Sequence, residues 1–444
     1  MAGPLWRQCQ RWLVGRAAAT LRRVARRDLP GSGAAAVAFA GPTAWKSRLA
    51  NELVPALQLN QKMDQRSTGT SLSLARRKYP ACSWRRIHSD AKPKDPFTLA
   101  QKDLSSLYDD IKKELFVSKE ELKSLCDYYF DGKGKAIRPM IVVLMARALN
   151  IHSNQEGDLL PGQRAVAMIS EMIHTASLVH DDVIDGSDER RGKRTINDVW
   201  GEKKAILAGD FILSAASMAL ARIGDITVVK VLAQVIEDLV RGEFMQLGSK
   251  ENESERFKHY LDKTFKKTAS LIANSCKAVC TFCLHRDRRR ASFFRLPVLT
   301  ALRPRQVSIL VNSDPDVHEI AYQYGRNVGI AFQLVDDVLD FTAGASQLGK
   351  PSAADLKLGL ATGPVLFACQ QFPELHVMIM RRFSRKGDVE RAWKFVLQSD
   401  GVQQTNFLAR RYCQEAVRHV SRLRPSPERD ALVALTHMVL TRDK

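Results

Sequence analysis

The chain has 444 residues, of which 45% are hydrophobic, and a formal net charge of +20. This length and apolar content suffice for a sizeable core in one large domain or two. The charge is uneven: residues 1–88 hold 16 Lys and Arg against 3 Asp and Glu, and the rest holds 52 against 45. Because most of the excess lies in the N-terminal segment, we expect no nucleic-acid partner.

The N-terminal segment begins MAGPLWRQCQRWLVGRAAATLRRVARR and has seven arginines before its first acidic residue, Asp28. Arginine and apolar residues alternate there at roughly helical spacing, which is typical of a mitochondrial transit peptide. Residues 29–95 are rich in Ala, Ser, Gly, Arg and Lys without clear periodicity, as in a poorly ordered linker. We therefore predict residues 1–95 to be presequence and linker and expect the protein in the mitochondrial matrix. A basic tail for lipid or RNA is the alternative.

From about Phe97 onward, apolar residues recur at threes and fours, the spacing of amphipathic helices. The clearest runs are Ile137–Leu149, Ala165–Val179, Lys204–Ile223, Val228–Gln246 and His318–Phe341. Alternating, strand-like runs are nearly absent. The pattern predicts an all-α domain over residues 96–444, in which long helices turn their polar interruptions toward a shared cavity. Since no run of 18 apolar residues occurs, we expect no membrane span.

One stretch, at about residues 280–306, interrupts this regularity. Its sequence, CTFCLHRDRRRASFFRLPVLTALRPRQ, is strongly basic and contains two prolines. Neither its composition nor its periodicity matches its flanks.

Two aspartate clusters are the strongest chemical feature of the sequence. Each is a D-D-x-x-D pattern at the end of an apolar run: Asp181, Asp182 and Asp185, then Asp336, Asp337 and Asp340. On a helix, the first and last aspartates of each pattern lie on one face. Several carboxylates on one apolar wall repel each other unless a cation holds them, and oxygen-only ligands suit Mg²⁺. The sequence therefore predicts a magnesium site around a diphosphate; two solvated acidic helix faces are the alternative.

Basic residues near these clusters add weaker indications of anion binding. Lys135 and Arg138 precede a helix, where free N–H groups already attract anions. Arg190 and Arg191 closely follow the first cluster, where cations can hold the outer oxygens of a diphosphate. Taken singly, such residues are more often solvated.

Three further positions gain weight only from the aspartates. His174 lies two helical turns before the first cluster, on the same face. Lys267 and Thr268 lie in a helical run, and Lys350 follows the second cluster. A lone histidine of this kind is more often a core residue, and a lone lysine usually faces solvent.

Together these positions resemble the trans-isoprenyl diphosphate synthase family. The match, in chain order, is Gly134-Lys135-x-x-Arg138-Pro139, Asp181-Asp182-x-x-Asp185 with Arg190-Arg191, Lys267-Thr268, Phe332-Gln333-x-x-Asp336-Asp337-x-x-Asp340, Gly349-Lys350 and Asp355-x-Lys357. It spans about residues 97–444, apart from the anomalous stretch at about 280–306. The family joins the two flanking helices through a short loop, so the resemblance implies that this stretch is an insertion extruded from the bundle as a loop. Such a loop costs little entropy, about 0.6 kcal/mol for each doubling of its length. The resemblance implies the isoprenoid-synthase type of helical bundle with a central cavity.

The resemblance also implies roles for these residues. All six aspartates are implied to be catalytic, with Asp181, Asp185 and Asp336 as Mg²⁺ ligands. The residues implied to hold isopentenyl diphosphate are Lys135, Arg138, His174 and Arg191. Those implied to hold an allylic diphosphate (farnesyl or geranylgeranyl) are Arg190, Lys267 and Lys350, and Thr268 and Gln333 are further substrate-binding residues. The allylic C–O bond would ionise, the double bond of isopentenyl diphosphate would attack the cation, and a proton would leave.

A long product is expected. Ala176 and Ser177, five and four residues before Asp181, are small, so no aromatic side chain closes the cavity below the aspartates, and Met172 and Ile173 lie further down. With the presequence, the resemblance implies a mitochondrial subunit that makes a long all-trans-polyprenyl diphosphate, of decaprenyl length, for the ubiquinone side chain. It implies a hetero-oligomer with a related second subunit. Because the product is a lipid, peripheral membrane contact is also expected.

Two other functions remain open. A terpene cyclase has the same bundle, but cyclases usually carry a mixed Asn/Ser/Glu motif in place of the second cluster, whereas Asp336, Asp337 and Asp340 are all present. The insertion keeps open an inactive or regulatory subunit of the hetero-oligomer. Such subunits tend to lose the first cluster, which this chain keeps.

Overall fold

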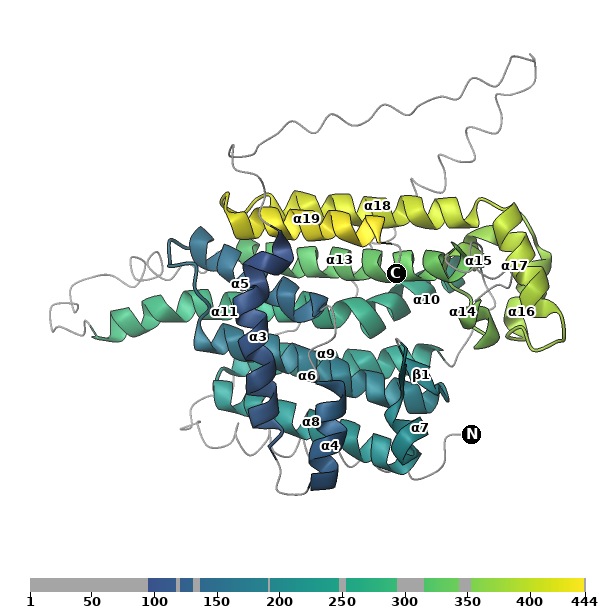
Figure 1. The fold of residues 1–444 in the computed structure, drawn as a ribbon. Helices are drawn as coiled ribbons and strands as arrows, with labels where there is room; N and C mark the ends of the chain where they lie inside the picture. The colour runs from purple at the N-terminus through teal and green to yellow at the C-terminus, as the bar shows by residue number, and fades with distance from the viewer. Residues whose placement is uncertain are drawn as a thin grey trace, which may run out of the picture. The chain divides into compact units, whose positions relative to one another are not determined.

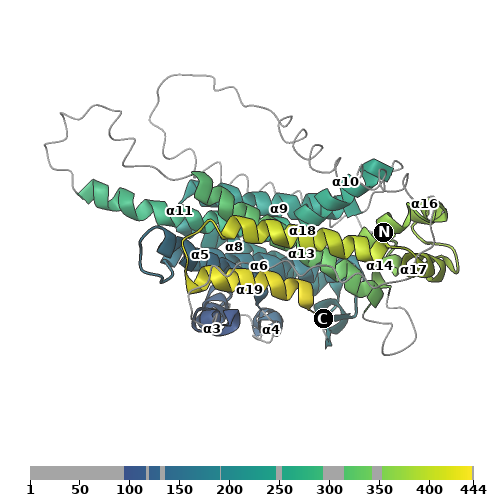
Figure 2. The ribbon, with the colours of Figure 1, turned by 90° about the horizontal axis from the view of Figure 1, so that it is seen from above.

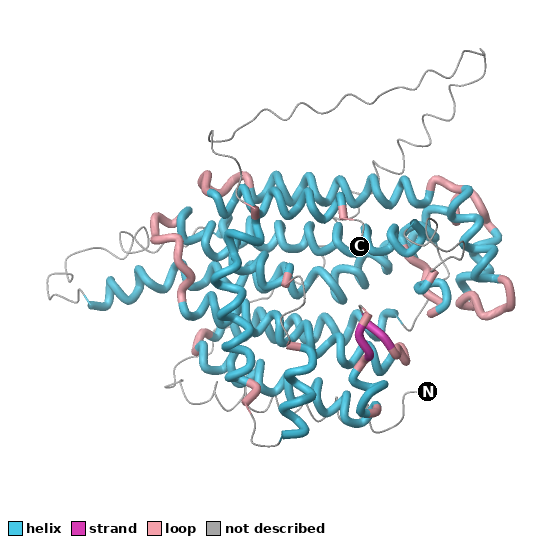
Figure 3. The backbone as a smooth tube through the Cα atoms, in the orientation of Figure 1, coloured by secondary structure: helices cyan, strands magenta, loops and turns pink. Residues whose placement is uncertain are grey.

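The computed structural model describes residues 95–116, 120–130, 136–190, 192–246, 253–293, 315–342 and 353–442. All of them lie in the unit Lys92–Lys444. Nearly all of these residues are helical. The only sheet among them is one hairpin of two strands, each two residues long (Figures 1 and 3). The predicted all-α fold is confirmed. The presequence and linker stay a prediction, because residues 1–94 lie outside the described ranges.

The elements follow one another in three groups. The first contains α3 (Pro96–Glu114), α4 (Glu120–Tyr129), α5 (Ile137–His152), α6 (Pro161–Ile184), β1 (Glu189–Arg190), β2 (Lys193–Arg194), α7 (Ile196–Trp200), α8 (Glu202–Ile223) and α9 (Ile226–Gln246). The second is one continuous rod of α10 (Glu253–Thr264), the π-helical turn η1 (Phe265–Ala269) and α11 (Ser270–Phe293). The third contains α13 (Pro315–Thr342), α14 (Ala354–Lys357), α15 (Gly363–Ala368), α16 (Glu374–Met380), α17 (Asp388–Gln398), α18 (Gly401–Val420) and α19 (Pro427–Thr441).

Local sequence explains where several helices begin. The side chains of Asp95 and Ser426 accept hydrogen bonds from the backbone N–H groups of Thr98 and Arg429, which caps α3 and α19. Proline occupies the first turn of α3, α6 and α19, where its missing N–H costs nothing. All five helical runs predicted from periodicity fall inside helices, namely α5, α6, α8, α9 and α13.

The long helices pack side by side around a common core. α13 packs most extensively on α18 and α11, and α6 packs on α8 (Figures 1 and 2). Their buried side chains, such as Leu144, Ile169, Met172 and Tyr324, form the main hydrophobic cluster. In Figure 1, α6 and α13 both end on the side of the bundle where β1 and α14 lie. The two aspartate clusters therefore lie at the same end of the molecule.

Helix α8 has the length and hydropathy of a membrane-crossing helix, alone among the described helices. It packs extensively on α6, and the alanines Ala205, Ala208, Ala216 and Ala219 along its buried face lie in the core. Part of its apolar surface thus packs inside the bundle, while Leu207 and Met218 on the same helix are exposed.

The stretch at 280–306 is partly described. Helix α11 continues without a break to Phe293, and its end projects beyond the neighbouring helices (Figures 1 and 2). The expectation of a loop is therefore wrong for residues 280–293. Those residues contain no Gly or Pro to stop a helix, and the first proline is Pro297. Residues 294–306 lie outside the described residues.

Two glycines of α13 allow backbone-to-backbone packing beneath the site. A Cβ atom at Gly329 would lie 2.6 Å from Cα of Ala269, and one at Gly325 would lie 2.8 Å from Cα of Ala273. Because these neighbours are backbone atoms, they cannot move aside as a flexible side chain would. The close contact fixes α13, with its aspartates, against η1 and α11.

We expect Gly329→Ala to destabilise the protein by about 1–3 kcal/mol, because overpacking forces the two helices apart. The overpacking cost is expected to outweigh the higher helix propensity of alanine, which favours it over glycine by about 1 kcal/mol. Thermal or urea unfolding measures the change, and Ala221→Ser, which adds one atom at an exposed position of α8, is the control. A Gly329→Ala protein as stable as the wild type would contradict this packing.

Candidate active site

The three aspartates of the first cluster point in different directions. Asp182 is buried, and its carboxylate accepts hydrogen bonds from the Tyr129 hydroxyl at 2.8 Å and from Nε of Arg190 at 2.6 Å. Burial and the bond to Asp182 raise the pKa of Tyr129. Burial opposes the charge of Arg190, but the bond to Asp182 and its negative charge outweigh this and raise the pKa of Arg190. Asp182 therefore ties the β1–β2 hairpin to α4 and α6 and orients Arg190, an arrangement that sequence spacing did not indicate.

Asp181 and Asp185 form an open carboxylate pair at the end of α6. Burial raises the pKa of Asp181 to about 7; Lys267 opposes this shift, and Glu243 and Asp185 add to it. Burial also raises the pKa of Asp185. Nζ of Lys267 lies 3.8 Å from the Asp181 carboxylate, too far for full compensation. The pair is therefore a ready ligand set for a cation.

Lys267 is held in place from α9. Its ammonium donates to the carboxylate of Glu243 at 2.7 Å and to the amide oxygen of Gln246 at 3.2 Å. Burial disfavours the charge, yet Asp181 and Glu243 together raise the pKa of Lys267. Gly242 makes this approach feasible, because a Cβ there would lie 3.0 Å from the backbone N of Lys267. Lys267 is in the π-helical turn η1, a distortion that often marks functional sites.

The second cluster divides its carboxylates in the same way. Asp337 is buried and accepts hydrogen bonds from the Tyr260 hydroxyl and from the Gln333 amide at 2.9 Å. The Thr268 hydroxyl donates to the same Gln333 side chain at 2.9 Å, which links η1 to α13. Asp337, Gln333 and Thr268 thus form one internal network.

Asp336 and Asp340 have partners from distant parts of the chain. The carboxylate of Asp336 pairs at 2.6 Å with Arg442, just beyond α19, although burial still raises its pKa. Asp340 accepts the backbone N–H groups of Ala354 and Asp355 at 3.0 and 3.2 Å and so holds the start of α14. Burial and the nearby aspartates raise the pKa of Asp355 to about 7, which adds another poorly compensated carboxylate.

A second basic group surrounds the ring of Phe332. Arg138, in the first turn of α5, donates to Nε2 of His174 at 2.7 Å, and its guanidinium lies 5.8 Å from the Phe332 ring centre. The Arg442 guanidinium stacks on the same ring at 3.7 Å and donates to the Phe332 carbonyl oxygen at 2.7 Å. Two guanidinium groups and a histidine therefore converge beside Asp336.

The described part of the site brings together most of the predicted residues. Burial lowers the pKa of Lys263, and the charges of Asp337, Asp355 and Glu243 oppose this shift. Lys135, Arg191 and Lys350 lie outside the described residues. Within the described ranges, no group of three or more His, Cys, Asp and Glu forms a ready-made metal site, so the three predicted Mg²⁺ ligands stay a prediction.

Sequence reasoning missed Glu243, Tyr260, Lys263 and Arg442. The sequence indicates a role for Glu243 only weakly, through its position three residues before Gln246 on the same helix. It gives no indication for Arg442, since only the path of α19 places the end of the chain beside α13.

The raised pKa of Asp181 predicts a pH-dependent stability change in metal-free protein. The fold favours the protonated form, so its contribution is full below the ordinary value of 3.8 and is lost as the pH rises through about 7. We expect Asp181→Asn to match the wild-type Tm near pH 4 and to exceed it increasingly up to about pH 7. Melting curves in a chelator measure this, and Asp182→Asn should instead lower Tm at neutral pH. Equal behaviour of the two variants would contradict the division of roles.

Comparison with known proteins agrees with this geometry. The family model described as polyprenyl synthetase matches residues 119–296 and 293–396. The human protein named all trans-polyprenyl-diphosphate synthase PDSS1 is 66% identical over 359 residues, 81% of this chain and 80% of its own. Decaprenyl-diphosphate synthase subunit 1 of Schizosaccharomyces pombe is 40% identical over 371 residues, 78% of this chain and 91% of its own. A probable mitochondrial hexaprenyl pyrophosphate synthase of Yarrowia lipolytica is 37% identical, covering 81% and 87%.

A solved structure shows the same fold. The polyprenyl synthase of Caulobacter crescentus, crystallised with calcium and isoprenyl diphosphate, superimposes with a TM-score of 0.64 at 26% identity, covering 80% of this chain and 100% of that one. With both carboxylate clusters, their cations and the helical bundle in place, the chain belongs to the polyprenyl synthetase family of prenyltransferases.

Proposed function

We propose that this chain is the catalytic subunit of a long-chain all-trans-polyprenyl diphosphate synthase that adds isopentenyl diphosphate to an allylic diphosphate. The observation that carries the proposal is the placement of two poorly compensated carboxylate groups, at the ends of α6 and α13, with cations beside each. The relatives named for polyprenyl and decaprenyl products support a long chain. We propose a decaprenyl product for the ubiquinone side chain.

The residues that would hold Mg²⁺ are Asp181, Asp185 and Asp336. Their carboxylates fit a divalent cation, because burial raises the pKa of each, and Lys267, at 3.8 Å from Asp181, opposes that shift without cancelling it. When bound, the metal neutralises the diphosphate of the allylic substrate and makes it a better leaving group. The calcium in the Caulobacter crystals supports a divalent ion in this type of site.

The cations divide between two substrates. Lys267 and Arg190 lie beside the first cluster and would hold the allylic diphosphate, with Lys350 as a predicted third group. Arg138 and His174 would hold the diphosphate of isopentenyl diphosphate, with Lys135 and Arg191 predicted to assist. The contact with Nε2 of His174 orients the Arg138 guanidinium, whose charge would bind the anion.

The reaction then requires positioning and exclusion of water. The allylic C–O bond breaks and its electron pair leaves with the diphosphate. The isopentenyl double bond attacks C1 of the allylic cation, and loss of a proton forms the new double bond. The network of Thr268, Gln333 and Asp337 would present polar oxygens of fixed orientation near this centre.

The helices below the aspartates carry small and aliphatic side chains on their facing surfaces. Ala176 is fully buried on α6, and Met172 and Ile173, one turn deeper, are also buried. α8 faces α6 with small residues, including Ala205 and Ala208. A wall of small and flexible aliphatic side chains fits a long polyprenyl product.

The remaining parts of the proposal concern location and assembly. The arginine-rich N-terminus and the mitochondrial relative support location in the mitochondrial matrix. Large apolar side chains are exposed on α8 and α9, namely Leu207, Met218, Ile226 and Phe244. Such a face fits a related second subunit, as the name of the fission yeast relative suggests.

Substitutions should separate the two diphosphate sites. We expect Lys267→Gln to raise KM for the allylic substrate about tenfold or more, and Arg138→Gln to do so for isopentenyl diphosphate, because each removes a charge-assisted hydrogen bond. Steady-state kinetics with one substrate varied at a time provide the measurement. Lys266→Gln is the matched control, since Lys266 pairs with Asp262 outside the site. Reversed substrate effects would refute the assignment.

The function itself is tested by incubating the full-length chain with Mg²⁺, farnesyl diphosphate and labelled isopentenyl diphosphate, with and without the second subunit, and separating the extracted products by length. A version lacking residues 294–306 is run beside it. We expect long-chain label from both versions when the second subunit is present. Label from the shortened version alone would indicate a regulatory or inactive form, and no label from either folded protein would refute the enzyme proposal.

A further inference from the structure

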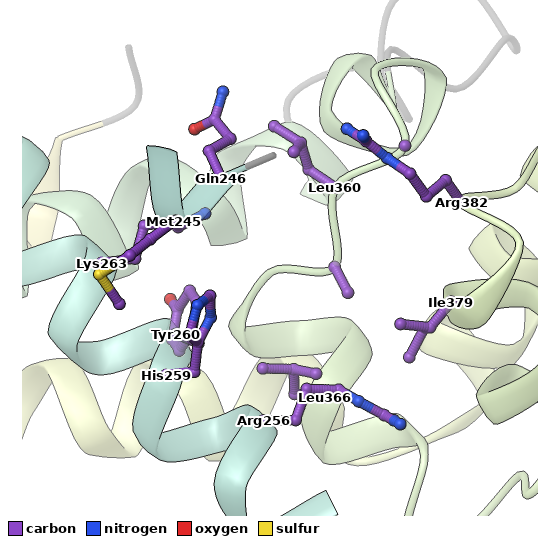
Figure 4. Close-up of a pocket in the computed structure, with 12 residues that line it drawn as sticks. Met245, Gln246, Arg256, His259, Tyr260, Lys263, Leu360, Leu366, Ile379 and Arg382 are labelled. Carbon is purple, nitrogen blue, oxygen red and sulfur yellow. The ribbon is translucent and has the colours of Figure 1, made fainter. Parts of the chain in front are cut away.

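A separate pocket lies between α10 and the segment from α14 to α16 (Figure 4). Four basic residues line it, and they come from two directions: Arg256, His259 and Lys263 from α10, and Arg382 from the turn after α16. Leu360 and Ile379 contribute to an apolar wall. No lining residue is acidic, which distinguishes this pocket from the aspartate clusters.

Two of these cations have no close acidic partner. Among the described residues, no side chain forms a hydrogen bond or an ion pair with the side chain of Lys263 or Arg382; the Lys263 ammonium lies 5.8 Å from the centre of the Tyr260 ring. Burial lowers the pKa of Lys263, although Asp337 and Asp355 act in the opposite direction. Arg256 is buried, and its guanidinium donates to Nδ1 of His376 at 3.0 Å, which fixes its orientation. An anion entering the pocket would therefore meet donors that are already oriented.

The turn that carries Arg382 has an unusual backbone. Arg382 and Phe383 both have a φ of +54°, which L-residues rarely adopt. Opposite them, Gly359 has a φ of +78°, and a Cβ there would lie 3.0 Å from the Arg382 carbonyl oxygen. The surrounding packing thus holds Arg382 at the rim of the pocket in a backbone conformation that costs energy. Strained backbone of this kind often occurs at binding sites.

The lining fits an anion that also has an apolar part. Several cationic N–H donors around one hollow suit the oxygens of a diphosphate, and Leu360 and Ile379 suit a hydrocarbon next to it. We propose that this pocket is a second, metal-independent site for the diphosphate head of a prenyl diphosphate. The proposal rests on the proposed function only for the identity of the ligand.

The pocket is also connected to the catalytic carboxylates. Tyr260 lines it and donates its hydroxyl proton to Asp337, and Gln246 lines it and accepts from Lys267. A ligand here would contact Tyr260 and Gln246, the two residues that hold Asp337 and Lys267. Occupancy would thereby act on the second aspartate cluster without competing for its metal.

The test is calorimetric titration of the full-length chain in a chelator, with farnesyl thiolodiphosphate and, separately, inorganic diphosphate. An Arg138→Gln background weakens the other metal-independent anion site. We expect this protein to bind one equivalent, and the added Arg382→Gln change to weaken that binding about tenfold. Arg385→Gln is the matched control, because Arg385 is exposed on the same segment and does not line the pocket. Lys263→Met is a second variant that should also weaken binding.

The outcomes are distinct. Tighter binding of the prenyl probe supports the proposal as stated, whereas equal affinities would overturn the prenyl assignment in favour of free diphosphate. No binding in the Arg138→Gln protein, or equal losses with Arg382→Gln and Arg385→Gln, would overturn the pocket. The assay measures binding and needs no turnover. If the chain is an active synthase but shows no such binding, only the pocket proposal is refuted. If the chain binds as expected but is inactive, only the proposed function is refuted.

Discussion

The structure depends on carboxylates buried at the ends of two helices without enough positive charge to neutralise them. Desolvation raises the pKa of Asp181 and Asp355 to about 7, and that of Asp336 above its ordinary value. A fold retains such groups only if something else recovers the cost, and a bound cation is the usual means. This unmet charge explains why basic residues far apart in the sequence, such as Arg138, Lys267 and Arg442, converge on one end of the bundle.

The six aspartates of the two clusters do not share one role. In each cluster the middle residue, Asp182 or Asp337, is buried and fully hydrogen-bonded, and it orients neighbouring substrate-site residues. Asp181 and Asp336 are more exposed and each has a cation from a distant part of the chain beside it, Lys267 and Arg442. The repeated pattern thus combines a buried anchor and a more accessible carboxylate at two adjacent positions.

Helix packing determines how accurately these groups are placed. Gly325 and Gly329 let α13 touch η1 backbone to backbone, and Gly242 does the same for α9. These contacts leave no space for adjustment, so Lys267 reaches Glu243 and Asp181 from a fixed direction. A positional error of a side chain in such a site would be costly, because interactions with a diphosphate depend strongly on geometry.

The sequence alone determined the helical class, five of the long helices, and the two clusters with most of their cations, because period, spacing and charge are local properties of a chain. It misjudged residues 280–293, where composition suggested a loop but the absence of Gly and Pro allows α11 to continue. Only the tertiary structure separated Asp182 from Asp181, placed Arg442 on Asp336, and assembled the basic pocket from α10 and the turn after α16. These features depend on contacts between residues that can lie more than a hundred positions apart, and only the packing of the helices brings such residues together.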